Sequence, residues 1–158
     1  MYKKILIPTD GSAMSNVAVQ CGVEFAKQLG ADVVGLFVAP EYQYPVFVEI
    51  VPSNFPTEDD YKASMHKAGD IYLQTIRDAA ATAGVTFSGV VEFSDATALQ
   101  IVHSAEKHGC DLIFICSHGR SGWGQALLGS VTAKVLSSCQ IPALVYRLPK
   151  QPDAAHGG

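Results

Sequence analysis

The residues of this chain best suited to bind an anion lie in two short segments in its last third. The first segment, Ser117 to Gly124, contains three glycines, and the second is Gly129-Ser130. An apolar run, Asp111 to Cys116, precedes them and predicts a buried strand. Glycine lets the backbone approach a ligand closely, and the free N–H groups at the start of a helix favour a phosphate. The pattern therefore predicts a phosphate-binding turn between a strand and a helix that begins at Ser130.

Nucleophilic catalysis is a second chemistry that these residue types allow. Ser117, His118 and Asp10 correspond to a nucleophile, a base and an orienting carboxylate. Adjacent residues that leave a strand are expected to point apart, however, and the Gly-x-Ser-x-Gly turn of many hydrolases is missing around Ser117. A hydrolase is therefore the less favoured interpretation.

Side chains alone do not predict a metal site. His103 and His108 are five residues apart in one helical segment, which places them on different faces, and the four cysteines lack the paired short spacings of a zinc site. We expect Mg²⁺ only as an ion that arrives with nucleotide phosphates, because this ion keeps several waters and uses phosphate oxygens.

Length and charge narrow the class of protein. A chain of 158 residues suits one domain, predicted over residues 1–148 and followed by a disordered tail, 149–158. The net charge is −4 and Lys and Arg form no cluster, which argues against a nucleic-acid partner. No apolar run approaches the roughly 18 residues of a membrane span, and no export signal precedes the first strand. Cysteines without a disulfide framework favour a cytoplasmic location.

Strand and helix patterns alternate along the chain. Runs typical of strands cover residues 4–8, 32–38, 85–93, 111–116 and 142–147, and helical spacing covers 14–29, 57–83, 95–108 and 130–139. Thr57 and Asp95 are the expected N-terminal caps of the second and third helices, and Gly30, Gly84 and Gly109 are the expected stops.

This alternation predicts a doubly wound α/β fold, a five-stranded parallel sheet with helices on both faces. Such sheets bind ligands outside the carboxyl ends of their strands, where the strand order reverses. Three loops from distant parts of the chain meet at that edge. They follow Pro8, Val38 and Cys116.

The chain resembles the universal stress proteins over nearly its whole length, from Lys4-Ile5-Leu6-Ile7-Pro8-Thr9-Asp10-Gly11-Ser12 to Ile141-Pro142-Ala143-Leu144-Val145. Members that bind ATP carry a Gly, two residues, a second Gly, nine residues, and a Gly followed by Ser or Thr. Gly119, the nine residues that follow it, and Gly129-Ser130 match this pattern, but Cys116 replaces the first Gly. The fold that the resemblance implies is the adenine nucleotide alpha hydrolase-like sheet.

The resemblance also implies a role for each matching residue. Pro8 and Asp10 would flank the adenosine, the Val38 backbone would read the adenine edge, and Ile115 would wall the pocket. Gly119, Gly129, Ser130 and Val131 would hold the phosphates. The full candidate set is Pro8, Thr9, Asp10, Val38, Ile115, Cys116, Ser117, His118, Gly119, Arg120, Gly129, Ser130 and Val131.

The function implied is that of an ATP-binding, stress-responsive regulator, at most a slow ATPase, that forms a homodimer through Ile141 to Arg147. The alternative is a member that does not bind ATP and works through protein contacts, because the Cys116 side chain stands where backbone is expected to meet the ligand. We expect Cys116 to weaken ATP binding.

Simpler structural roles remain open for several of these residues. Asp10 can form a turn or cap the first helix without any ligand, and Ser130 can be an ordinary N-terminal cap. The aromatic segment from Pro40 to Pro56 is either a functional lid or a loop that covers the open end of the sheet.

Overall fold

A computed structural model describes residues 1–46, 49–118 and 127–148 of the chain. The predicted tail, 149–158, and the candidate residues Gly119 and Arg120 lie outside the described residues. The elements in chain order are β1 (Lys4–Pro8), α1 (Ala13–Leu29), β2 (Asp32–Ala39), α2 (Glu58–Ala83), β3 (Phe87–Phe93), α3 (Thr97–Lys107), β4 (Leu112–Cys116), α4 (Ser130–Ser138) and β5 (Ala143–Tyr146).

The five strands form one parallel sheet in the order β3-β2-β1-β4-β5. The chain builds the sheet outward from β1 through β2 to β3, and then crosses back to place β4 on the other side of β1. The strand order therefore reverses at β1 and β4. In open parallel sheets the crevice at the carboxyl ends of such strands is the usual ligand site.

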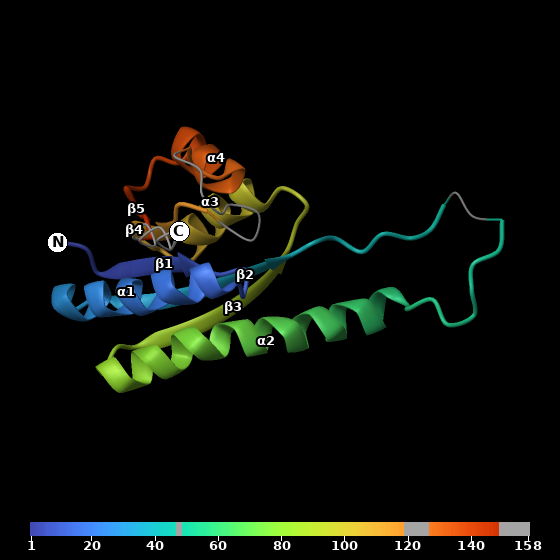
Figure 1. Ribbon diagram of the computed structural model, residues 1–158, viewed down its shortest axis with the longest axis horizontal. Coiled ribbons are helices and arrows are strands. Elements are labelled where there is room, and N and C mark those ends of the chain that lie inside the picture. The colour runs from blue at the N-terminus through green and yellow to red at the C-terminus, as the bar shows by residue number, and fades with distance from the viewer. Residues whose placement is uncertain (47–48, 119–126, 149–158) are drawn as a thin grey trace, which may run out of the picture.

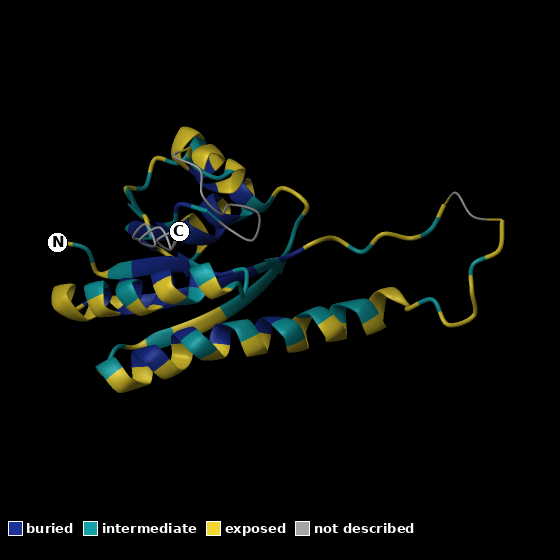
Figure 2. Ribbon diagram, viewed as in Figure 1, coloured by how far each residue is buried: buried dark blue, intermediate teal, exposed yellow. Residues whose placement is uncertain are grey.

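Helices cover both faces of the sheet, with α1 and α2 on one face and α3 and α4 on the other (Figure 1). Alternate residues of β1 point into the two layers: Ile5 and Ile7 join the core beneath α1 and α2, and Leu6 joins the core beneath α3. The strands at the centre are buried, whereas the outer faces of the helices are exposed (Figure 2). The predicted fold class, a doubly wound five-stranded parallel sheet, is confirmed.

Most predicted helix ends are confirmed. Gly30 and Gly84 end α1 and α2 in the left-handed conformation, with φ of 65° and 72°, and Thr57 caps α2 in a reciprocal capping box with Asp60. Three strands are shorter than predicted, because β3 begins at Phe87, β4 begins at Leu112 and β5 spans only 143–146. α4 likewise ends one residue earlier than predicted.

The predicted cap of α3 is wrong. Its N-cap position is Ala96, which makes no side-chain cap bond, and the helix begins at Thr97. Asp95 instead accepts hydrogen bonds from the Glu41 backbone N–H, at 3.0 Å, and from Gln43 Nε2, at 3.3 Å. This carboxylate therefore fastens the loop before α3 to the chain that leaves β2.

The connection between β2 and α2, residues 40–57, is here called the arm. Its described residues project past the body of the protein beside the start of α2 (Figure 1). The Tyr61 hydroxyl donates to the Pro40 carbonyl at 2.7 Å, and the Tyr42 hydroxyl donates to the Pro56 carbonyl at 2.8 Å. Because its described residues pack on themselves and on α2, that part of the arm does not cover the open end of the sheet, and the covering-loop alternative is wrong for it.

No helix among the described residues is both long and apolar enough to cross a membrane.

Candidate functional site

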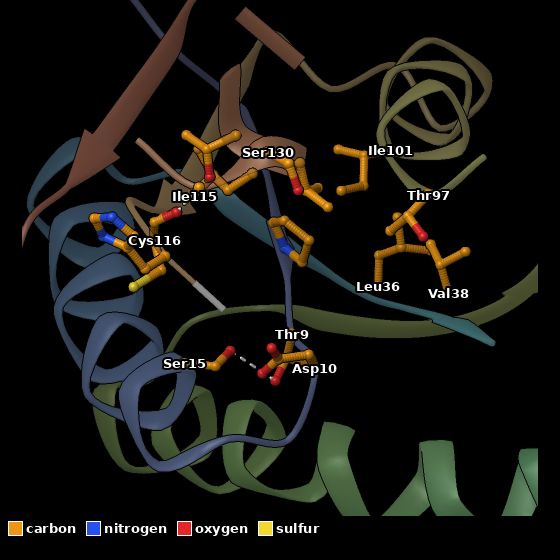
Figure 3. A pocket seen from close by; sticks show the side chains of 15 residues that line it. Thr9, Asp10, Ser15, Leu36, Val38, Thr97, Ile101, Ile115, Cys116 and Ser130 are labelled. Carbon is orange, nitrogen blue, oxygen red and sulfur yellow. Dashed lines mark hydrogen bonds between the residues drawn. The ribbon is translucent and has the colours of Figure 1, made fainter. Parts of the chain in front are cut away.

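A cavity of about 230 Å³ opens at the carboxyl ends of β1 and β4, where the strand order reverses. The segments that follow β1 and β4 line it as predicted, whereas the chain leaving β2 contributes only strand residues, among them Val38 (Figure 3). Its walls are Pro8, Thr9, Asp10, Ser15, Leu36, Val38, Thr97, Ile101, Ile115, Cys116, His118, Gly129, Ser130, Val131 and Thr132. None of the described arm residues is among them, so a lid formed by that part of the arm finds no support in this structure.

Hydrogen bonds hold the loop after β1 in a fixed shape. The Thr9 hydroxyl accepts from the Gly11 N–H, at 3.1 Å, and from the Ser15 hydroxyl, at 3.0 Å. Asp10 Oδ1 accepts from the Ser12 N–H at 2.9 Å, which is an Asx turn. The cap of α1 is Ser12. Asp10 therefore has the turn-forming role, does not cap the helix, and also lines the pocket.

Gly11 itself is required by this turn. Its φ of +74° lies in the left-handed region, and a Cβ at this position would collide with the ring of Tyr72. Any side chain here would push apart the loop and α2, and would carry Asp10 away from the pocket.

The N-terminus of α4 faces the same cavity. Gly129 is its N-cap residue in an extended conformation, with φ −61° and ψ 155°, and no side chain of the described residues caps the helix. Ser130 is the first helical residue, so the interpretation of Ser130 as an ordinary cap is wrong. The first turn also contains no acidic residue. Within the described residues, no side chain occupies the N–H groups of this turn, so they are available to an anion, which the helix dipole favours.

Ser117 and His118 occupy different environments although they are adjacent. Ser117 is 4% exposed and does not line the pocket, contrary to prediction, whereas His118 does. The Ser117 N–H donates to the Tyr146 carbonyl, and the Ser117 carbonyl accepts from the Gly129 N–H, both at 2.8 Å. Ser117 thus extends the β4–β5 pairing and supports the turn into α4.

The side chains of this pair do not point apart as predicted, because Ser117 Oγ lies 3.1 Å from His118 Nδ1. The burial of Ser117 nevertheless keeps its hydroxyl out of the cavity. A substrate in the pocket would meet His118 and not the supposed nucleophile. The geometry gives the hydrolase interpretation no support.

Cys116 contributes a half-buried thiol to the pocket wall. Its sulfur lies 4.0 Å from the Met14 carbonyl, on the α1 side of the cavity and turned away from Ser130 (Figure 3). Burial raises the pKa of this thiol, and the nearby Asp10 carboxylate adds to the rise, against an opposing effect of the His118 and Ser117 amides. Cys116 is therefore held in its neutral, weakly nucleophilic form.

The pocket has an apolar part and a polar part. Leu36, Val38, Ile101 and Ile115 form the apolar part, and the polar groups lie toward Asp10 and the start of α4. Asp10 carries the only formal charge among the described lining residues other than the titratable His118 and Cys116. The described residues hold no group of three or more His, Cys, Asp or Glu that could bind a metal ion.

Five lining residues were not predicted from the sequence: Ser15, Leu36, Thr97, Ile101 and Thr132. Ile101 was predicted as an inward residue of α3, and the same helical spacing that places it in the core brings it to the cavity. Thr97 and Ser15 carry no sequence signal, since a hydroxyl near a helix start is common in any protein.

Comparison with known proteins gives the chain a family. The model of the universal stress protein family matches residues 1–147. Universal stress protein MJ0531 of Methanocaldococcus jannaschii is 31% identical over 155 residues, which are 96% of this chain and 85% of the relative. Universal stress protein YxiE of Bacillus subtilis is 30% identical over 151 residues, 93% of this chain and 100% of the relative.

Solved structures share the fold. That of MJ0577 from M. jannaschii superposes with a TM-score of 0.78 at 27% identity, covering 96% of this chain and 99% of the other. More distant structures with the same fold hold adenine nucleotides: a universal stress protein with cAMP (20% identity, 92% and 97% coverage, TM-score 0.62), one from Archaeoglobus fulgidus with dAMP (16%, 91% and 97%, 0.61), and one from Arabidopsis thaliana with AMP (13%, 96% and 97%, 0.62). Since the family model and two relatives at 30% identity or more span almost the whole chain, this protein belongs to the universal stress protein family.

Proposed function

We propose that the pocket binds an adenine nucleotide, with ATP as the first ligand to test, and that the protein acts as a stress-responsive regulator. Its family and the cAMP, dAMP and AMP complexes of distant relatives support an adenine nucleotide. Four cysteines without disulfides support a cytoplasmic location.

The uncapped start of α4 is the observation that carries this proposal. Most helix starts have a side chain that satisfies one of the free N–H groups, and here Gly129 provides none. The phosphates lie against the N–H groups of Ser130 and Val131, and the Ser130 hydroxyl adds one further donor. The site lies at the reversal of strand order, where parallel sheets commonly bind nucleotides.

The other parts of the pocket match the other parts of a nucleotide. The purine ring lies in the apolar part beside Val38 and Ile115, and the ribose lies between the ring and the phosphates, near Asp10. Pro8 and Thr9 shape the wall at that point, and His118 and Cys116 close the side that adjoins α4 and α1.

Charge balance favours a nucleotide that brings Mg²⁺. No lysine or arginine lines the described pocket, and Asp10 adds a negative charge to it. A triphosphate bound through helix N–H groups alone keeps most of its charge, which Mg²⁺ would offset while retaining its own waters. With no cationic side chain to stabilise a transferring phosphoryl group in the described pocket, ATP hydrolysis is slow.

A single substitution at the start of α4 tests this assignment. Ser130→Asp places a carboxylate at the proposed phosphate position, where it repels the ligand but interacts favourably with the helix dipole. Wild type at about a hundred times the dissociation constant of Mg-ATP gains roughly 2.7 kcal/mol of stability. The aspartate variant should melt at or above the temperature of free wild type and lose the ATP-dependent rise.

Two controls complete the test. Ser130→Asn, which has a similar shape and no charge, should keep most of the shift, and Ser138→Ala lies at the far end of the same helix and should keep all of it. If wild type shows no shift with Mg-ATP, AMP or cAMP, the nucleotide proposal fails and the alternative, action through protein contacts alone, takes its place.

A further inference from the structure

The apolar part of the pocket contains one polar side chain, that of Thr97. It lies beside Leu36 and Val38, at the opposite side of the cavity from Cys116 (Figure 3). In the proposed function this part holds the purine ring, so the inference below rests on that function. A hydroxyl among aliphatic side chains is the group that can distinguish a base from any other flat apolar ligand.

No described residue of the protein uses the Thr97 hydroxyl. Thr97 is the first residue of α3, and within the described part of the chain its side chain makes no hydrogen bond and does not cap the helix. The residue expected to cap α3, Asp95, is held instead by Glu41 and Gln43. A hydroxyl can donate one hydrogen bond and accept others, and this one faces the cavity with both capacities open.

Next to Thr97, the backbone of β2 offers one further hydrogen-bond donor and one acceptor, the N–H and C=O of Val38. The Asp32 N–H donates to Lys3, and the Leu36 carbonyl accepts from Thr9, so the even-numbered residues of β2 direct their backbone groups toward β1. The pairing with β1 ends at Pro8 and Leu36. The N–H and C=O of Val38, the next residue in this series, therefore face the space beyond the end of β1, where the cavity lies.

We infer that the Thr97 hydroxyl is a specificity-determining group that contacts the N6 and N7 side of the bound adenine. The Val38 N–H and C=O form the donor–acceptor pair that matches N1 and one hydrogen of the 6-amino group. The second hydrogen of that group and the N7 acceptor then remain without a partner in an apolar wall. Thr97, beside Val38, is the side chain that satisfies them.

The first test is a comparison of Mg-ATP affinity by titration calorimetry. Thr97→Val keeps the branched shape and removes the hydroxyl, and should weaken binding roughly three- to tenfold, the range expected for one hydrogen bond. Thr97→Ser restores the hydroxyl and should bind within about twofold of wild type by the same reasoning. Thr86→Val makes the same change at an exposed position outside the pocket and should leave the affinity unchanged.

The second test locates the contact on the base. Wild type and Thr97→Val are each titrated with 7-deaza-ATP, which lacks N7, and with purine riboside triphosphate, which lacks the 6-amino group. If Thr97 contacts N7, Thr97→Val should bind 7-deaza-ATP as tightly as wild type does; if it contacts the 6-amino group, the two proteins should bind purine riboside triphosphate equally. This is the logic of a double-mutant cycle. A valine penalty that stays the same with both analogues overturns the inference, as does the absence of any penalty with ATP.

The outcomes separate this inference from the function on which it rests. Failure of wild type to bind any adenine nucleotide removes both. Tight binding by wild type together with equally tight binding by Thr97→Val leaves the proposed function in place and shows that Thr97 does not read the base.

Discussion

The Thr132 hydroxyl donates a 2.8 Å hydrogen bond to the backbone carbonyl of Cys116. Thr132 is in the first turn of α4 and is 3% exposed, and Cys116 is the last residue of β4. A second bond, from the Gly129 N–H to the Ser117 carbonyl at 2.8 Å, lies beside it. Together they fix the start of α4 at the carboxyl end of β4, so that the open N–H groups of the helix face the cavity.

Removing the Thr132 hydroxyl should lower the stability of the fold and weaken nucleotide binding. Thr132→Val leaves the partly buried Cys116 carbonyl without its side-chain partner, and should lower the free energy of unfolding by roughly 1–3 kcal/mol. Urea denaturation measures this loss, and titration with Mg-ATP should show weaker binding as α4 loosens. Thr132→Ser, which keeps the hydroxyl, should recover most of the lost stability and most of the lost affinity for Mg-ATP. Wild-type stability in the valine variant would show that the bond does not hold α4 in place.

Local sequence signals predicted most of the fold because they act over a few residues. A glycine that must adopt positive φ, as Gly30 and Gly84 do, ends a helix whatever surrounds it. Asp95 was mispredicted because its partners, Glu41 and Gln43, are more than fifty residues away and outcompete the helix end for the carboxylate. The course of the arm was mispredicted for the same kind of reason, since it depends on contacts with α2 that no local pattern encodes.

The site was only partly predictable. Loops that follow parallel strands meet at one edge, and this rule brought Pro8, Val38 and Ser130 to the same cavity. The rule does not say which way a side chain turns. Ser117 points into the protein, and Thr97 enters the pocket from a helix start that the sequence assigned to a different residue.

A carboxylate far from the pocket should make stability depend on pH. Asp111 accepts hydrogen bonds from the backbone N–H groups of Lys3 and Lys4 at 2.9–3.1 Å. Slight burial alone would raise the pKa of this carboxyl, but the Lys4, Lys3 and Asp111 amides and the charge of the N-terminus together outweigh it and hold the pKa below its ordinary value. A lowered folded-state pKa means that the stabilisation is complete above the unfolded pKa and disappears as the pH falls through the folded one.

Asp111→Asn should therefore destabilise the protein at pH 7 by roughly 1 kcal/mol, a modest figure because the site is largely exposed. The difference from wild type should shrink below about pH 4, where the unfolded carboxyl becomes protonated. Urea denaturation of wild type and variant at pH 7, 5 and 3 measures this difference in the free energy of unfolding. A difference that is the same at all three pH values would mean that the charge of Asp111 contributes nothing.

The position of the Cys116 sulfur changes the expectation drawn from the family pattern. Because the sulfur lies against the Met14 carbonyl, Cys116→Gly should alter Mg-ATP affinity by less than about threefold, and should cost roughly 1 kcal/mol of stability from the lost packing and the added backbone freedom. Calorimetry and thermal melting measure the two effects. A large gain in affinity would instead restore the view that this side chain obstructs the ligand.

The same thiol reports on the pocket by its reactivity. Burial and Asp10 raise the pKa of Cys116, so iodoacetamide at pH 7.5 should modify it slowly, and bound Mg-ATP should slow the reaction further. Peptide mass spectrometry follows each cysteine separately. Cys139, which is outside the pocket, serves as the control whose rate the nucleotide should not change.

The outer edge of β5 is the surface on which the proposed homodimer depends. Carbonyls of Pro142 and Tyr146 accept hydrogen bonds from the β4 side, so the even-numbered residues of β5 face β4. The N–H and C=O groups of Ala143 and Val145 therefore point outward from the last strand of the sheet. An apolar strand with an open edge invites pairing with a second copy.

Val145→Pro removes one outward N–H group and leaves the bonds to β4 intact, because proline is tolerated on an edge strand when its nitrogen faces outward. We predict that wild type is a dimer at tens of micromolar, a concentration suited to micromolar association, and that this variant is a monomer with its nucleotide site preserved. Light scattering measures the mass. Val91→Pro makes the same change on β3, the opposite edge of the sheet, and should remain dimeric. Wild type that is monomeric, or a Val145→Pro protein that is still dimeric, would place any assembly on a surface other than residues Ile141 to Arg147.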